Sequence, residues 1–221
     1  MKRILIIFSF LFLIPNFTFA DFKKIKKKAT ITKPEIIFPM PKNLKRCKTT
    51  ISVNPEFNHV TPVLKVEAPS GYGLDKRFNH AQNKFENFSF PCGGGNIEAC
   101  EHVKRVILDW AKSNAAQRTG PSDGEGRHWN DTLTVNLYIA SPMMAAYSFA
   151  KQVIAVPENE DKIIKDWFKR IVKKNEHLMY EYSNYKPESG AGGVPKRAHN
   201  HALSSAMSHM QLGILFNDNK L

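Results

Sequence analysis

The chain has 221 residues, a formal net charge of +12 at pH 7 and three cysteines. The excess of lysine and arginine favours contact with acidic glycans, anionic lipids or nucleic acid, although a lysine-rich proteome would give the same balance. No C-x-x-C pair is present, which argues against a cysteine zinc site.

Residues 1–20 have the three parts of a cleavable signal peptide. Lys2 and Arg3 give a positive start, the run from residue 4 to 14 is almost wholly apolar, and Thr18-Phe19-Ala20 supplies small residues before a cut. A membrane anchor is the alternative, but a span needs about 20 apolar residues and this run is shorter. We expect cleavage between Ala20 and Asp21, a periplasmic or secreted product, and no membrane association afterwards.

Residues 21–70 are expected to form an irregular arm, because prolines interrupt a lysine-rich stretch that has no helical period. In an oxidising compartment a disulfide can persist, and one of three cysteines must remain unpaired. Sequence alone cannot fix the pair. We favour Cys47 with Cys100, which would tie the arm to a helix, over Cys92 with Cys100, which would only clamp a glycine-rich turn.

The remaining chain, residues 71–221, is predicted to be an all-α domain. Apolar periodicity predicts helices over 98–113, 132–156 (one helix, or two broken near Pro142), 158–182 and 200–216. No clear alternating strand pattern follows residue 65. The polar, glycine-rich stretches 118–130 and 183–196 read as loops, so we expect helical hairpins whose loops gather on one rim and carry function.

The densest group of reactive side chains is the stretch Arg197-Ala198-His199-Asn200-His201, predicted to open the last helix. The free N–H groups at a helix amino terminus attract anions, so this junction suits a carboxylate. Two other interpretations stay open. His199 and His201 could bind a metal with His209, or the stretch could be a helix cap with surface histidines.

With these residues the chain resembles the alginate lyases of polysaccharide lyase family 5 and their wider alginate-lyase-domain relatives. The likeness covers about residues 70–221. Asn200 and His201, with Arg197 upstream, match the family's asparagine-histidine pair, and the stretch 72–77 (YGLDKR) is similar to its lid loop. Three helical segments also match: 100–110 (CEHVKRVILDW), 145–151 (AAYSFAK) and 164–168 (IKDWF).

The resemblance implies an (α/α) toroid of helical hairpins, incomplete in this chain. The family's catalytic tyrosine and a partner arginine lie several dozen residues beyond the histidine, whereas this sequence ends at Leu221. The chain also departs from the family after the histidine, where Ala202, Leu203 and Ser204 replace an expected aromatic residue, and it lacks the family's tryptophan in the third helix. We therefore expect a partial member that alone gives little or no cleavage.

By the same resemblance, the expected function is cleavage of a uronic-acid polymer, alginate or poly-mannuronate, by β-elimination. Asn200 would bind the substrate carboxylate, and His201 would help to neutralise it or take the proton. Lys76, Arg77, Arg197 and His199 would bind the polymer. The expected protein is a monomer that needs no metal or organic cofactor and binds no nucleic acid.

Two competing functions belong to other classes. A non-catalytic periplasmic protein could keep the anion-binding end as an acidic-glycan-binding or structural module. A hydrolase would need two carboxylates flanking the scissile bond. Asp123 and Glu125, in the polar loop near Trp129, are the crowded acids that could serve.

Overall fold

The computed structural model describes residues 35–40, 60–66, 75–118, 134–173 and 194–218, and leaves the side chains of residues 118 and 194–203 undescribed. Within these ranges the regular structure is almost entirely helical, which confirms the all-α prediction. The elements are β1 (Lys65–Val66), α2 (Lys76–Gly93), α3 (Ile97–Lys112), β2 (Gln117–Arg118), the π-helix η2 (Val135–Ala140), α5 (Ser141–Val153), α6 (Glu158–Lys173) and α8 (Val194–Phe216).

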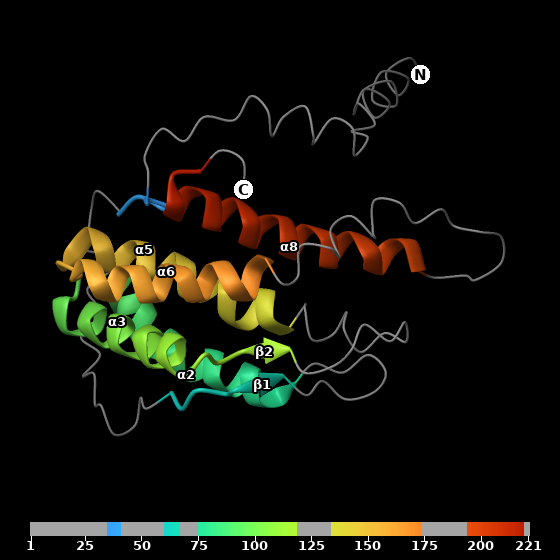
Figure 1. Ribbon diagram of the computed structural model, residues 1–221, viewed down its shortest axis with the longest axis horizontal. Helices are drawn as coiled ribbons and strands as arrows, with labels where there is room; N and C mark the ends of the chain where they lie inside the picture. The colour runs from blue at the N-terminus through green and yellow to red at the C-terminus, as the bar shows by residue number, and fades with distance from the viewer. Residues whose placement is uncertain (1–34, 41–59, 67–74, 119–133, 174–193, 219–221) are drawn as a thin grey trace, which may run out of the picture.

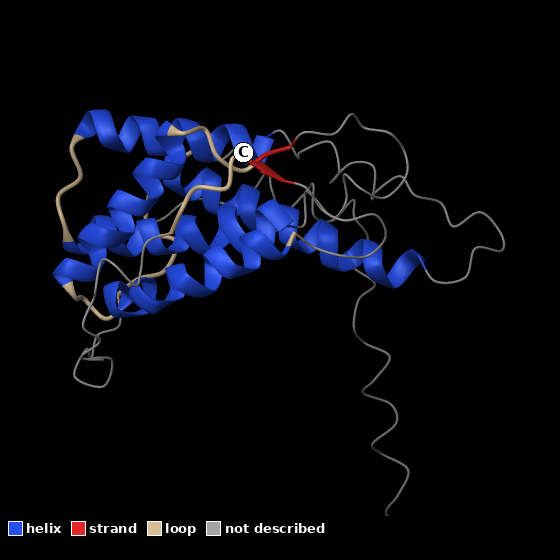
Figure 2. Ribbon diagram, turned by 90° about the horizontal axis from the view of Figure 1, so that it is seen from below, coloured by secondary structure: helices blue, strands red, loops and turns tan. Residues whose placement is uncertain are grey.

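The helices stack in layers (Figure 1). Helices α2 and α3 form one antiparallel hairpin, η2 with α5 and then α6 form a second one above it, and α8 lies across the outer side of the second hairpin. The strands β1 and β2 are two residues each and pair in parallel, so they contribute little besides a local tie (Figure 2). The predicted array of helical hairpins is therefore present, and closure into a toroid stays a prediction.

Helix α2 precedes the first helix predicted from the sequence. Its buried residues recur at intervals of three and four, which is the period of one helix face. The Asp75 side chain caps the helix by accepting a hydrogen bond from the Arg77 N–H at 3.1 Å. The buried face packs on α3 and α5 and consists of Phe78, Ala81, Phe85, Phe88, Pro91 and Cys92.

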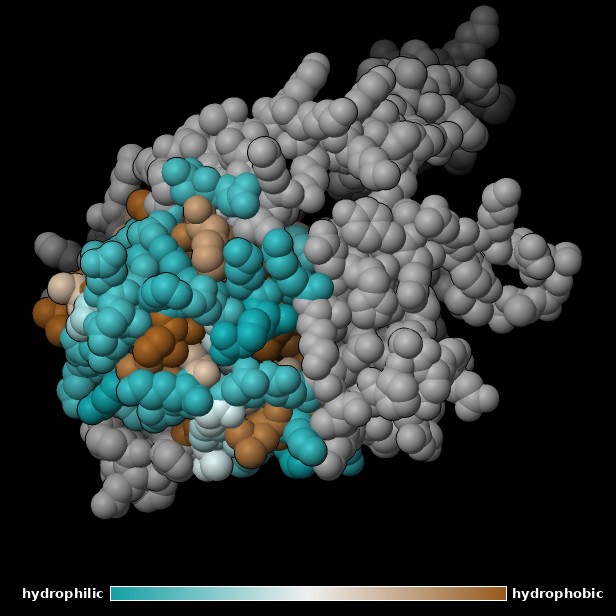
Figure 3. Space-filling model, in the orientation of Figure 1, coloured by the Kyte–Doolittle hydropathy of each residue, from teal (hydrophilic) through white to brown (hydrophobic). Residues whose placement is uncertain are grey.

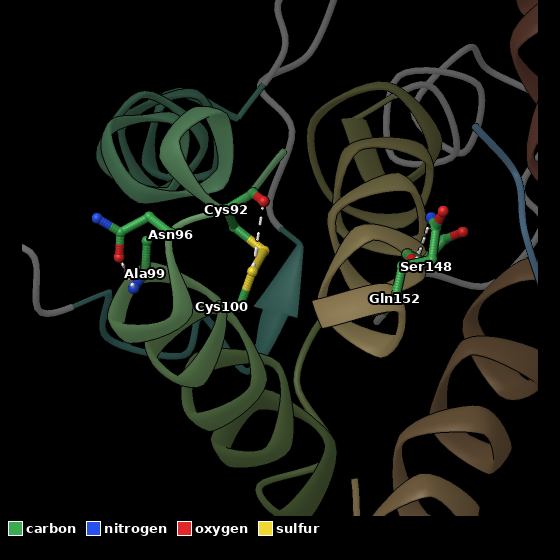
Figure 4. Close-up of a disulfide and its surroundings, with 6 residues drawn as sticks. All are labelled: Cys92, Asn96, Ala99, Cys100, Ser148 and Gln152. Atoms are coloured by element: carbon green, nitrogen blue, oxygen red, sulfur yellow. Dashed lines mark hydrogen bonds between the residues drawn. A yellow bond between two sulfur atoms is a disulfide. The ribbon is translucent and has the colours of Figure 1, made fainter. Parts of the chain in front are cut away.

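The disulfide joins Cys92 to Cys100, so the predicted pairing of Cys100 with Cys47 is wrong (Figure 4). The physical reason is the tight turn between α2 and α3. Gly95 adopts a positive φ of 85°, and the Asn96 side chain accepts a hydrogen bond from the Ala99 N–H at 2.9 Å to start α3. This turn brings the Cα atoms of the two cysteines to 4.6 Å apart.

The core is centred on two fully buried tryptophans, one from each hairpin. The rings of Trp110 (α3) and Trp167 (α6) meet edge to face with centroids 6.4 Å apart. Each indole N–H is satisfied by a backbone carbonyl: Trp110 donates to Val60 at 3.1 Å and Trp167 to Ala115 at 2.9 Å. These bonds fasten the segments that flank β1 and β2 to the hairpins, since a buried indole N–H needs a partner.

Residues 35–40 of the predicted arm lie along α5. The Ser148 hydroxyl accepts a hydrogen bond from the Ile37 N–H and donates one to the Glu35 carbonyl, both at 2.8 Å. The Glu35 N–H donates to the Ile214 carbonyl in α8 at 2.9 Å. The arm segment thereby ties α5 to the carboxyl-terminal end of α8.

A cluster of charged side chains surrounds Glu35, the residue that links α5 to α8. Lys151 and Lys165 each contact the carboxylates of both Glu35 and Asp161, and Tyr147 donates a hydrogen bond to Asp161 at 2.6 Å. Burial opposes ionisation of the two acids, but their hydrogen-bonded partners outweigh it, so the pKa of Glu35 and that of Asp161 are below their usual values. Burial and then the bond to Asp161 raise the pKa of Tyr147 well above its usual value.

The predicted helix over 132–156 is one rod with a change of winding. It is π-helical over Val135–Ala140 and α-helical from Ser141, and Pro142 stands in the first turn of the α-helical part, where its missing N–H costs least. Among the described residues no helix has the length and apolarity needed to cross a membrane. The face seen in Figure 3 is mostly hydrophilic, with separate small apolar patches.

Candidate functional site

The described bundle has two distinct ends. One end, here called the turn end, carries the α2–α3 turn with its disulfide, the α5–α6 connection and the carboxyl terminus of α8 (Figure 1). The opposite end, here called the loop end, contains residues 65–66, 75–77, 112–118, 134–137, 170–173 and 194–201. Hydrogen bonds from α6 to residues 114 and 115 and from Arg77 to the Lys65 carbonyl hold several of these segments together.

Charge is separated between these two ends. Helices α3 and α6 both begin with acidic residues at the turn end and finish with basic ones at the loop end, an arrangement that the helix dipole favours. Helix α2 runs the opposite way and begins with two basic residues at the loop end. The exposed cations at the loop end include Lys65, Lys76, Arg77, Lys112, Arg170 and Lys173. The acids at the turn end include Glu98, Glu101, Glu158, Glu160 and Asp161, and the last two and Glu101 are paired with lysines.

Lys76 and Arg77, both predicted to contact substrate, stand in the first turn of α2 rather than in a loop. Arg77 is 49% exposed, but its guanidinium holds the buried Asp75 carboxylate at 2.7 and 3.0 Å and donates to the Lys65 carbonyl at 3.1 Å. Its first task is therefore to fix the start of α2 against β1. Lys76 is exposed beside this contact. The stretch 72–74 of the predicted lid lies outside the described residues.

Helix α8 begins at Val194, so the predicted start at Asn200 is wrong and the asparagine-histidine pair lies about two turns inside the helix. Arg197, Asn200 and His201 are three and four residues apart, spacings that share one side of a helix. His199 is two residues from His201 and falls on the other side of the axis. The metal interpretation through those two histidines loses its geometric basis, because a single ion needs both ligands on one side. Their side chains lie outside the described part.

The amino-terminal turns of α8 extend past the other described helices at the loop end, as both ribbon views show (Figures 1 and 2). Further along α8, Ser205, Ser208 and His209 face the interior. Extending the buried positions 205, 208 and 212 backwards at helical spacing reaches position 201. The backbone of α8 therefore places residue 201 on the same side of the helix as these buried positions.

A buried polar group that the sequence analysis missed lies in η2. Asn136, in η2, is 1% exposed, and neither heteroatom of its amide has a hydrogen-bond partner among the described residues. The hydroxyls of Thr134 and Ser205 are buried without a partner in the same sense. Such groups are rare, because a buried polar atom that loses its hydrogen bonds to water without gaining a protein partner destabilises the fold. The sequence did offer a signal for these groups, because an asparagine and a threonine interrupt an otherwise apolar stretch there.

The comparisons with known proteins give one match. Residues 94–221, more than half of the chain, match the family model described as alginate lyase. No curated protein and no solved structure matches the chain. The matched range begins in the turn between α2 and α3 and includes Arg197, Asn200 and His201.

Proposed function

Because the chain belongs to the alginate lyase family, whose activity is that of a polysaccharide lyase on alginate, we propose that it is exported and cleaves mannuronate-rich alginate at the loop end of the bundle by β-elimination. The observation that carries this placement is the concentration of exposed cations at that end, where the amino-terminal half of α8 also lies. A polymer with one carboxylate per sugar is attracted to such a surface, and the attraction weakens with salt.

The elimination needs a carboxylate whose charge is neutralised. The proton on ring carbon 5, next to the carboxylate carbon, is removed, the bond from carbon 4 to the glycosidic oxygen breaks, and a double bond forms between carbons 4 and 5. The leaving oxygen takes up a proton. Negative charge grows on the carboxylate during the first step, so donors placed there lower the barrier.

In this proposal Asn200 donates a hydrogen bond to the substrate carboxylate. His201 helps to neutralise the carboxylate or takes the proton, because an imidazole with a pKa near 6.5 is suited to either task. The shared side of α8 supports a joint role for Arg197, Asn200 and His201. His199 stands on the other side of that helix, which restricts it to contacts with a more distant part of the polymer.

The two basic residues at the start of α2 have different parts. Lys76 is exposed and offers a mobile ammonium to a carboxylate of the polymer. The Arg77 guanidinium is already paired with the Asp75 carboxylate, which offsets part of its positive charge. Arg77 therefore acts chiefly by fixing the first turn of α2, which carries Lys76. Lys112, Arg170 and Lys173 extend the basic surface across the ends of α3 and α6.

Export is the second part of the proposal. The tripartite stretch 1–20 motivates it, and the disulfide between Cys92 and Cys100 supports it, because disulfides persist in oxidising compartments. A periplasmic or secreted enzyme would meet its polymer outside the cytoplasm.

Product chemistry tests the proposal. The complete gene product is incubated with mannuronate-rich alginate, and the fragments are analysed by mass spectrometry and ultraviolet absorbance. Elimination gives fragments with an unsaturated terminal sugar that absorbs ultraviolet light and is lighter than a hydrolysis fragment by one water. Saturated fragments would indicate a hydrolase, and salt-sensitive binding without any fragments would indicate a non-catalytic glycan-binding protein.

A further inference from the structure

We propose that Arg170 binds a carboxylate of the polymer, apart from the one that Asn200 and His201 are proposed to neutralise, and that Asn114 is a positioning residue that aims the Arg170 guanidinium. The inference deepens the proposed function and rests on it for the identity of the polymer. It turns one cation of the basic surface into a defined uronate-binding site, whose two residues come from the end of α6 and from the connection between α3 and β2.

The first observation is the way in which the Arg170 guanidinium is held. Arg170 is exposed in the last turn of α6, and its Nε atom donates a hydrogen bond to the Asn114 Oδ1 atom at 3.3 Å. With Nε engaged, the two terminal nitrogens, Nη1 and Nη2, remain as a pair of parallel donors. Such a fork fits both oxygens of one carboxylate, whereas a lysine ammonium offers only a point charge.

The second observation is that no described acid takes this fork. Among the described residues, the only hydrogen-bond partner of the Arg170 side chain is the amide already named. Asp166, about one helical turn earlier on α6, is instead paired with Lys162 at 2.7 Å. Lysines nearer the turn end, such as Lys104 and Lys151, are paired with glutamates. Arg170 therefore presents a positive charge and two donors to an anion from outside the chain.

The third observation is the rigid support of the Asn114 amide. Asn114 follows the end of α3 with a φ of 52°, which asparagine tolerates, and its N–H and that of Ala115 donate to carbonyls near the end of α3. The Ala115 carbonyl accepts a hydrogen bond from Trp167 of α6 at 2.9 Å. Because Trp167 is three residues before Arg170, the two partners are held relative to each other before a ligand arrives, which lowers the cost of binding.

The fourth observation is the continuity of this site with the start of α2. The chain continues from the connection after α3 into β2, where Gln117 pairs with Lys65 of β1, and the Lys65 carbonyl accepts a hydrogen bond from Arg77 at 3.1 Å. Both strands lie at the loop end (Figures 1 and 2). Exposed Lys65 and Lys76 therefore stand on the same edge of the bundle as Arg170. A polymer with repeated carboxylates can contact several of these cations at once, so that weak individual attractions combine.

Lys169 provides a matched control for the charge of Arg170. It is exposed and precedes Arg170 on α6, but its ammonium lies over the Phe216 ring of α8, 5.4 Å from the ring centroid. Consecutive residues lie on different sides of a helix, so the two side chains point apart. Removing either charge changes the net charge of the chain equally. The comparison therefore separates a defined site from general attraction between a basic protein and an acidic polymer.

The test measures the equilibrium dissociation constant, Kd, of a mannuronate oligosaccharide for the complete gene product, with His201→Ala as the parent so that the ligand is not cleaved. Arg170→Gln removes the charge and the fork, whereas Arg170→Lys keeps the charge and removes the fork. Asn114→Gly removes the amide and keeps the positive φ. Lys169→Gln is the control. Melting temperatures check that each variant is folded.

We expect Arg170→Gln to raise Kd about five- to tenfold, and Arg170→Lys and Asn114→Gly to raise it about threefold. Lys169→Gln should raise Kd less than about twofold, because exposed charges outside the contact are screened. Equal effects of Arg170→Gln and Lys169→Gln would overturn the inference. So would an Arg170→Lys protein that binds as tightly as the parent, since charge alone would then suffice. A folded Asn114→Gly protein with the Kd of the parent would refute the positioning role.

The proposed function is judged by a separate result, the elimination products of the wild-type protein. If wild type gives none although the parent binds the oligosaccharide, the lyase function fails, and the comparison of Arg170→Gln with Lys169→Gln still decides the inference. A parent that does not bind the oligosaccharide would overturn the inference, whereas unsaturated products from wild type would still support the lyase.

Discussion

At the scale of single residues, one hydroxyl shows how the charged cluster is held. Tyr147 is buried and donates to the Asp161 carboxylate at 2.6 Å. A hydrogen bond to a charged group contributes about 1.5–3 kcal/mol, so Tyr147→Phe should lower the free energy of unfolding by about that amount. Urea denaturation measures it. Tyr138→Phe is the control, because Tyr138 is only partly buried, and a loss equal to that of Tyr147→Phe would contradict the assignment.

The same cluster predicts how stability depends on acid. The pKa of Glu35 and that of Asp161 are lowered in the folded chain, since lysines and Tyr147 outweigh the effect of burial. Their contribution is complete above the unfolded values, 4.5 and 3.8, and is lost as the pH falls through the lower folded values. Melting temperatures measured down through this range should fall less steeply for Asp161→Asn than for wild type. Parallel curves would contradict the prediction.

Residue types alone indicated the candidate site but not its supports. Arg197, Asn200 and His201 stood out because three polar donors close together are unusual. Asn136 did not, because nothing in a sequence shows that an asparagine in an apolar stretch will be buried without a partner. Arg77 was expected to bind substrate, whereas its bond to Asp75 depends on a helix start that the sequence analysis did not predict.

At the scale of elements, a strong apolar periodicity in the sequence was sufficient to predict a helix. Helices α3, α5 and α6 were predicted from apolar residues at helical spacing, and the described bounds agree to within a few residues. The predicted continuation of α6 over residues 174–182 lies outside the described residues. Helix α2 was missed because its aromatic residues are separated by many polar ones and Pro91 lies in its last turn. The start of α8 was placed too late, since the glycines just before it and Pro195 in its first turn resembled a loop.

The disulfide is a prediction that belongs to the α2–α3 turn. Non-reducing peptide mapping should recover Cys92 linked to Cys100, leaving Cys47 without a cysteine partner in the chain. Closing so short a loop restricts the unfolded chain modestly, so Cys100→Ser should lower the free energy of unfolding by about 2–3 kcal/mol. Cys47→Ser is the matched control. A Cys47–Cys100 peptide would restore the original expectation and refute the pairing described here.

At the scale of the whole molecule, exposed and mostly unneutralised cations gather at the loop end of the described bundle, whereas most acids at the turn end are paired with lysines. This asymmetry could not be read from net charge, because it arises from the alternating directions of the hairpin helices. It provides a physical reason for an acidic polymer to approach the end at which Asn200 and His201 lie. The expected array of helical hairpins is present in the described residues, and the placement of function on the loops of one rim stays a prediction.

Export is a prediction about the whole chain. If residues 1–20 are a signal peptide, the exported protein should begin at Asp21, because Thr18 and Ala20 supply the small residues that the peptidase requires. Intact-mass spectrometry of protein recovered from the periplasm or medium checks the start. Recovery of a chain that still carries Met1 from either compartment would contradict the proposed cleavage.

The central claim is that the side of α8 shared by Arg197, Asn200 and His201 performs the elimination. The most direct measurement is the initial rate of ultraviolet absorbance on mannuronate-rich alginate for the complete gene product, compared between His201→Ala and His199→Ala. We predict that His201→Ala loses about a hundredfold or more, as expected for the loss of a general base, whereas His199→Ala, on the other side of the helix, keeps most of the rate. Equal losses in the two variants, or a His201→Ala enzyme as fast as wild type, would contradict the account.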